Sequence, residues 1–239
     1  MPPRKNGWAL AAGLAVALLA PAAPARAGER YYMIIFGAER GVFEPQYTHS
    51  WGVFVRACGE GPCPESYRLE AYVISWLPQT MEIRLLALRP EPGWNVELHR
   101  TIRWALGTGQ EVAKWGPYEI DRELFCRAVR QSRRLSAGPE LYKAVDTGYD
   151  STQVSNCIHV LDDLRQGGRL RVGSPGWGFV ASYIITLRLE PWIIDSCKTH
   201  EWVAARLGLG CYPIQDRDIR RNPRSPLGLD RRPLRVLMP

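Results

Sequence analysis

Three absences narrow what this chain of 239 residues can be. It has no apolar run of about 18 residues or more, so a transmembrane helix of normal length is excluded. It has no internal repeat and no interior linker, which predicts a single domain. It also does not have the composition of a disordered chain, because its nine Trp and ten Tyr can bury a large apolar area.

Several catalytic and metal-binding motifs are missing as well. Neither a G-x-S-x-G nucleophile elbow nor a phosphate-binding P-loop occurs in the sequence. A zinc-protease helix would need a second His four residues after His200, and that position is Ala204. The cysteines do not form two pairs at zinc-knuckle spacing. We therefore expect neither a metal site nor a cofactor.

Residues 1–27 have the features of a secretory signal peptide rather than of a folded segment. Two basic residues precede an apolar stretch over residues 8–20, and the small residues Ala25 and Ala27 suit a signal peptidase. We expect cleavage after Ala27 and a periplasmic or secreted protein.

The net charge of +7 is unevenly distributed along the chain. The signal segment and the final segment, residues 216–239, carry all of the excess positive charge, so residues 28–215 are neutral overall. A neutral domain argues against a nucleic-acid partner. The final segment is rich in Arg and Pro and has no apolar period, which predicts a disordered tail.

Six cysteines follow the signal segment, and an oxidising compartment makes disulfides the default expectation. Cys58 and Cys63 flank a short turn with two Gly and a Pro, so this is the first disulfide that we expect. Cys197 and Cys211 are the second expected pair. Six cysteines allow about 15 pairings, so the sequence leaves the full connectivity open.

The hydrophobic pattern predicts an α+β domain over residues 28–215. Three strands are expected to form an antiparallel meander, over residues 31–36, 50–57 and 67–77. A short strand is expected within 142–145, and the apolar segment 177–189 is either a buried helix or a strand. Three helices are expected, at 121–134 with Asp121 as N-cap, from 155 or 156 to 165, and at 200–207.

Two residues stand out for their chemistry. His49 lies at the start of the second predicted strand, and Cys157 lies at the predicted start of a helix. Unpaired backbone N–H groups at a helix start favour a thiolate, and a nearby imidazole can accept and return its proton. These two residues are the parts of a nucleophilic thiol site. His159, two positions after Cys157, points away from the thiol on a helix and is expected to be structural.

The two segments that carry these residues resemble a known group. Tyr47-Thr-His49-Ser-Trp-Gly52 precedes Ser155-Asn-Cys157-Ile-His159 in the chain. This order is similar to the circularly permuted NlpC/P60 superfamily, which includes lecithin:retinol acyltransferase-like and YiiX-like cysteine hydrolases. The resemblance implies a papain-like fold, an antiparallel sheet packed on helices. The acyltransferase pattern N-C-E-H-F stands here as Asn-Cys-Ile-His-Val.

The resemblance also implies roles for particular residues. Cys157 would be the nucleophile, His49 the general base, and Tyr47 a donor to the oxyanion. The superfamily places a third, orienting residue on the next strand, where Ser75 is the match, with Glu70 and His99 as other candidates.

Two functions from different classes follow. The first is an exported thiol hydrolase, protease or acyltransferase that acts on an amide or ester bond in a peptidoglycan peptide, a lipid acyl group or another small molecule. The alternative is a non-catalytic envelope protein, with a binding or structural role, on the same fold.

Overall fold

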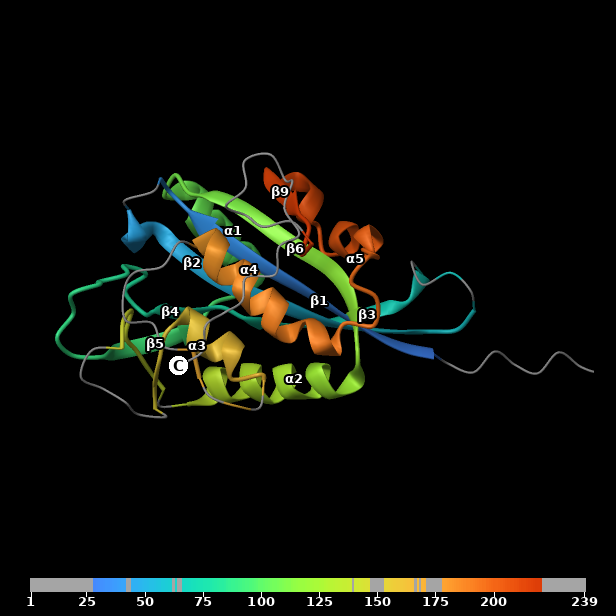
Figure 1. Cartoon of the computed structure of the whole chain (residues 1–239), viewed down its shortest axis with the longest axis horizontal. Helices are drawn as coiled ribbons and strands as arrows, with labels where there is room; N and C mark the ends of the chain where they lie inside the picture. The colour runs from blue at the N-terminus through green and yellow to red at the C-terminus, as the bar shows by residue number, and fades with distance from the viewer. Residues whose placement is uncertain are drawn as a thin grey trace, which may run out of the picture.

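The computed structural model describes residues 28–41, 44–61, 63, 66–138, 140–146, 153–165, 167, 169–170 and 178–220. The expected signal segment lies outside the described residues, as do residues 221–239 of the expected tail. The remaining chain is an α+β structure, which agrees with the fold class expected from the hydrophobic pattern (Figure 1).

A five-stranded sheet forms the middle of the structure, with the strand order β3-β2-β1-β6-β9. These strands are β1 (Gly28–Glu39), β2 (Thr48–Gly59), β3 (Arg68–Ile74), β6 (Glu111–Ile120) and β9 (Ile214–Arg217). The first three are antiparallel neighbours in chain order, so the expected meander is confirmed. β6 pairs with β1 antiparallel, and β9 adds to β6 in parallel.

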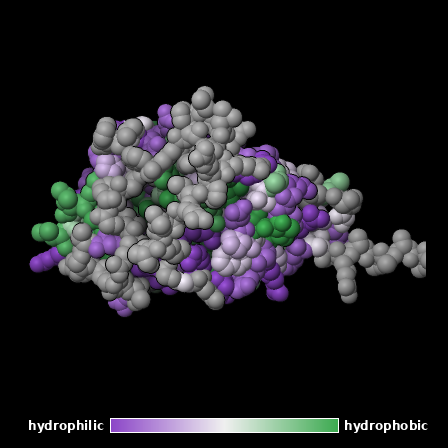
Figure 2. Space-filling model, in the orientation of Figure 1, coloured by the Kyte–Doolittle hydropathy of each residue, from purple (hydrophilic) through white to green (hydrophobic). Residues whose placement is uncertain are grey.

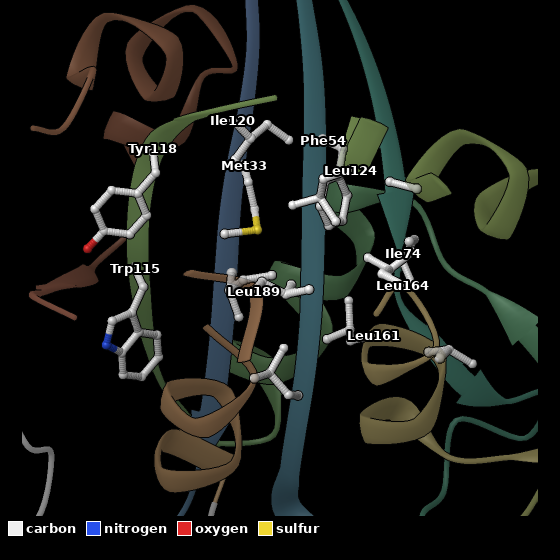
Figure 3. Packing of buried hydrophobic residues seen from close by; sticks show 14 of the residues in the cluster. Met33, Phe54, Ile74, Trp115, Tyr118, Ile120, Leu124, Leu161, Leu164 and Leu189 are labelled. Atoms are coloured by element: carbon white, nitrogen blue, oxygen red, sulfur yellow. The ribbon is translucent and has the colours of Figure 1, made fainter. Parts of the chain in front are cut away.

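Both faces of this sheet are covered by helices, so residues 31–36 of β1 and 51–55 of β2 are buried on both faces. On one face lie α2 (Arg122–Ala137), α3 (Cys157–Asp162) and α4 (Gly178–Leu189). On the other face lie α1 (Leu98–Gly107) and α5 (Glu201–Arg206). Figure 3 shows the first of these two cores, where Met33 and Phe54 of the sheet meet Leu161 and Leu189 of the helices.

A second, smaller sheet holds the segment that precedes Cys157. Its order is β4-β5-β7-β8, with β4 (Trp76–Pro78), β5 (Glu91–Asn95), β7 (Leu141–Tyr142) and β8 (Val154–Ser155). β8 pairs with β7 through Tyr142 and Ser155, and the chain then enters α3 directly. Three short 3-10 helices complete the described elements, at Pro45–Tyr47, Glu190–Trp192 and Leu209–Cys211.

The expected helices are present, with shifted ends. Asp121 caps α2 by accepting a hydrogen bond from the backbone N–H of Leu124, as predicted. Asn156 caps α3, and α4 takes the helical alternative for the apolar segment. Sequence reasoning did not identify α1 or β6, because the glycines between residues 91 and 116 were interpreted as breakers. In the structure Gly107 ends α1 and Gly109 lies in the turn before β6.

The expected boundary of the tail at residue 215 is wrong, because that residue lies inside β9. Asp216 in the same strand forms an ion pair with the buried Lys114 of β6, at 2.5 Å. Beyond β9, Ile219 is buried in the core against the α2–α4 face. The charged segment therefore contributes at least five ordered residues, 216–220, to the domain.

All six cysteines are free thiols, so neither expected disulfide is formed. Cys58 is the second-last residue of β2 and its sulfur lies 3.9 Å from a carboxylate oxygen of Glu29, while Cys63 is exposed in the turn. Cys197 precedes α5 in the chain and Cys211 follows it, and both are exposed free thiols.

Candidate thiol site

Cys157 is positioned by the strand and the cap that precede it. β8 fixes Ser155 beside Tyr142, and the Asn156 side chain accepts hydrogen bonds from the backbone N–H groups of Ile158 and His159. The side-chain nitrogen of Asn156, Nδ2, donates a hydrogen bond to the carbonyl oxygen of Ala144 at 3.2 Å. These bonds hold the first turn of α3 in place, with Cys157 as its first residue.

The Cys157 thiol is buried, and burial raises its pKa to about 11. The backbone N–H groups of Ser50, Cys157 and Ile158 act in the opposite direction and lower the pKa. The loss of solvent outweighs these donors, so the resting group is a neutral thiol at neutral pH. The N–H groups at the helix start thus act as the sequence indicates, but the sequence does not reveal how deeply the sulfur is buried.

His49 is buried among aromatic side chains at the start of β2. Its ring stacks on Trp51 with centroids 5.4 Å apart and meets the edge of Trp104 at 5.8 Å. Loss of solvent lowers the pKa of His49 to about 3. The imidazole is therefore neutral across the physiological pH range.

A chain of three hydrogen bonds fixes the tautomer of His49. Nε2 of His49 lies 3.0 Å from Oγ of Ser75, which lies 2.9 Å from Oγ1 of Thr101. Thr101 donates its one hydroxyl proton to the carbonyl oxygen of Glu97, which can only accept. Ser75 therefore donates to Thr101 and accepts from Nε2–H, so the lone pair of the neutral ring resides on Nδ1.

His49 and Cys157 line one cavity of about 40 Å³, together with Ser50 and residues from other segments. Nδ1 of His49 is buried and has no hydrogen-bond partner among the described residues, so no N···S hydrogen bond joins the pair. The reason is the pleat of β2: His49 shares a face with Trp51, whereas Leu161 of α3 packs against Gly52 on the opposite face. His49 and Cys157 therefore share a cavity only at the start of β2.

The three candidates for an orienting residue are placed differently. Ser75 accepts the hydrogen bond from His49 described above. Glu70 instead pairs with Arg56 of β2, about 23 Å along the strand from His49. His99 bonds through Nδ1 to the hydroxyl of Tyr212, 3.1 Å away. Of the three, the structure brings Ser75 alone to His49.

Tyr47 is not placed where the resemblance implies. It ends a 3-10 helix just before β2, and the guanidinium of Arg40 lies 3.8 Å from its ring centroid. It is not among the described residues that line the cavity of Cys157. The donors that face the sulfur of Cys157 are backbone N–H groups, those of Ser50, Cys157 and Ile158.

His159 has a partner of its own. Its Nε2 lies 3.2 Å from a carboxylate oxygen of Asp146. Burial lowers the pKa of His159, and the nearby Asp146 carboxylate acts to raise it. Within the described ranges, no three side chains of His, Cys, Asp or Glu gather closely enough to hold a metal ion.

Sequence reasoning missed two parts of this site. Thr101 belongs to α1, whose cap Glu97 is followed by the apolar spacing Leu98, Ile102 and Ala105, and this pattern was a readable helix signal. The Ser50 N–H that points at the sulfur could not be identified from the sequence. Whether a backbone N–H is free to bind a side chain depends on where its neighbouring strand stops pairing, and no local pattern records this. No protein-family model, curated protein or solved structure matches the chain.

Proposed function

We propose that the protein is an exported thiol hydrolase or acyltransferase that acts on an amide or ester bond. Cys157 is the nucleophile, His49 is the general base, and Ser75 orients the base. The observation that carries the proposal is the unpartnered lone pair on Nδ1 of a buried histidine that lines the same cavity as a buried cysteine. The proposal includes a papain-like fold of the permuted NlpC/P60 type, supported by a histidine on a strand and a cysteine that opens a helix.

The proposed reaction begins from two neutral groups. As the sulfur of Cys157 attacks the carbonyl carbon, its proton transfers to Nδ1 of His49. The bond from the carbonyl carbon to the leaving oxygen or nitrogen then breaks, and His49 returns the proton to that atom. Water cleaves the resulting thioester in a hydrolase, and a hydroxyl or amine does so in a transferase.

The backbone N–H groups of Ser50 and Cys157 stabilise the negative oxygen of the tetrahedral intermediate in this scheme. The cavity of about 40 Å³ has room for little more than a water molecule. Ile83 and Leu85, from the loop between β4 and β5, form part of its wall. A substrate larger than this cavity requires its wall to open, and the reaction requires the His49 ring to come within hydrogen-bond reach of the sulfur.

The test is the formation of an acyl–enzyme. The purified protein is incubated with p-nitrophenyl esters of short and long acyl chains, and acylated peptides are mapped by mass spectrometry. We expect the acyl group on Cys157, none in Cys157→Ala, and acylation slowed by about 100-fold or more in His49→Gln. Cys126→Ala is the control, because Cys126 does not line the cavity. Acylation of another cysteine, or an unchanged rate in His49→Gln, would contradict the proposal.

A non-catalytic binding role on the same fold is the second candidate. It is favoured by the missing hydrogen bond between His49 and Cys157 and by the two opposed pKa shifts, which keep both groups neutral. Folded protein that binds acyl or peptide ligands but forms no acyl–enzyme with any ester would support this candidate over the first.

A further inference from the structure

The loop between β4 and β5, residues 79–90, presents leucines directly to solvent. From Ile83 to Leu88 the side chains alternate: Ile83 is buried, Leu85 and Ala87 are half-buried, and the residues between them are exposed. Leu86 is 92% exposed and Leu88 is 88% exposed. Exposed leucines are common singly, but two that project from one loop at nearly full exposure need an explanation.

This loop is anchored beneath its exposed side. Ile83 packs in a small apolar cluster with Leu77 and Val96. The indole nitrogen of Trp104 donates to the carbonyl of Met81 at 3.2 Å, and Nζ of Lys143 donates to the carbonyl of Ala87 at 3.1 Å. The inner side of the loop is thus held by packing and hydrogen bonds, and this support keeps the leucines directed outward.

The loop lies at one end of the long axis of the molecule. In Figure 1 it forms the far left of the picture, beyond β4 and β5. Figure 2 shows hydrophobic side chains gathered at the same end. No other described element extends beyond the loop in this view.

Cationic side chains flank the two leucines. Arg84 and Arg89 are both exposed on the same loop. Glu82 is also exposed and pairs with Arg84 at 3.0 Å, so the loop carries one net positive charge. Apolar side chains at a tip with arginines on either side match the boundary between acyl chains and anionic headgroups. A protein partner would instead need a broad surface around the leucines.

We infer that this loop docks the protein on a lipid bilayer that carries anionic headgroups. Leu86 and Leu88 enter the interfacial region of the bilayer, and Arg84 and Arg89 remain at the level of the phosphates. Because Ile83 and Leu85 on the inner side of the same loop line the cavity of Cys157, docking places that cavity beside the bilayer. The docking itself does not depend on the thiol chemistry proposed above.

The test measures vesicle binding and needs no turnover. The protein is centrifuged with vesicles of phosphatidylcholine alone or mixed with phosphatidylglycerol, and the bound fraction is measured. We expect binding to the mixed vesicles, weakened about 10-fold by Leu86→Ser or Leu88→Ser alone and about 100-fold by both. Arg84→Gln with Arg89→Gln should reduce binding to the mixed vesicles and remove the preference for phosphatidylglycerol.

Ile194→Ser is the matched control, because Ile194 is 65% exposed and lies outside the loop. It should bind the mixed vesicles as the unaltered protein does. Absence of binding by the unaltered protein, or equal binding by the double leucine variant, would overturn the inference. Equal binding to both vesicle types would overturn its anionic part. Self-association that the leucine substitutions abolish, without vesicle binding, would make the loop a contact between copies of the chain.

Discussion

At the scale of single residues, the most informative group is the imidazole of His49. Burial of a polar nitrogen without a partner costs about 1–3 kcal/mol, and Nδ1 of His49 is such an atom. The other ring nitrogen is satisfied through Ser75 and Thr101. This asymmetry leaves a neutral ring with its acceptor directed away from the hydrogen-bond chain, as a general base requires.

The tautomer of His49 should depend on Ser75. In the unaltered protein, nitrogen NMR of the His49 ring is expected to show the proton on Nε2, because Ser75 can only accept there. In Ser75→Ala this preference should weaken, and the loss of the acceptor should destabilise the fold by about 1–3 kcal/mol.

Thr186→Ala provides the matched control for this experiment. Thr186 is also fully buried, and its hydroxyl donates to the carbonyl of Ser182 at 2.7 Å within α4, on the other face of the sheet. Its removal should lower stability but leave the ring nitrogens of His49 unchanged. An unaltered tautomer in Ser75→Ala would argue against the positioning role of Ser75.

His49 should also make stability depend on pH. Its pKa is about 3 in the fold and near the usual 6.5 in the unfolded chain, so between these values the unfolded chain alone takes up the proton. This contribution to stability is present above pH 6.5 and is lost as the pH falls, by about 1.4 kcal/mol per pH unit.

Urea unfolding of the protein and of His49→Gln at a series of pH values checks this prediction. The stability of the unaltered protein should fall more steeply below about pH 6 than that of the variant. Above about pH 7.5 the two curves should be parallel, because His49 is then neutral in both states. Parallel curves in mild acid would mean that the folded chain accommodates the imidazolium.

At the scale of elements, the packing of α4 on β1 depends on a close approach of two backbones. A Cβ atom added at Gly178 would lie 1.9 Å from the carbonyl oxygen of Ala38. One added at Gly37 would lie 2.7 Å from the hydroxyl of Ser182. These glycines bring the start of α4 next to β1, and Gly178 also lines the cavity of Cys157.

Gly178→Ala should therefore destabilise the protein by about 2 kcal/mol or more, because the backbone of β1 cannot yield to the new methyl group. Gly107→Ala, at the end of α1, is the control, since nothing lies within 4 Å of its added Cβ. That change should be neutral or stabilising by up to about 1 kcal/mol, because Ala favours the helix. Thermal unfolding of both variants distinguishes them, and equal melting temperatures would refute the packing argument.

At the scale of the whole molecule, the last described strand completes the central sheet. β9 covers the free edge of β6, and its Asp216 and the α5 residue Glu201 both pair with the buried ammonium of Lys114. Ile219 is then buried beside Tyr118. The backbone N–H of Ile219 donates a hydrogen bond to the hydroxyl oxygen of Tyr118 at 3.2 Å. Among the described residues, no helix combines the length and the apolar character needed to cross a bilayer.

Truncation measures the contribution of this strand. A chain that ends after Gln215 should be less stable by several kcal/mol than one that ends after Arg220, because it loses the Asp216 ion pair and the buried Ile219. Chemical unfolding of the two truncated chains gives the difference. Equal midpoints would show that the sheet does not need its fifth strand.

The sequence by itself determined the local features of this protein. The apolar run of β1, the polar caps Asp121 and Asn156, and the meander of the first three strands follow from patterns within a few residues. The family resemblance named Ser75 as the residue that orients His49, and the two side chains do form a hydrogen bond.

Only the tertiary structure decided the properties that depend on distant segments. The thiol of Cys157 is neutral because strands, loop and helices exclude water from it, and no local pattern records that burial. The free state of Cys197 and Cys211 and the place of Asp216 in the sheet likewise depend on how elements pack. Burial and long-range pairing are properties of the assembled core, whereas caps and periodicity are properties of the chain.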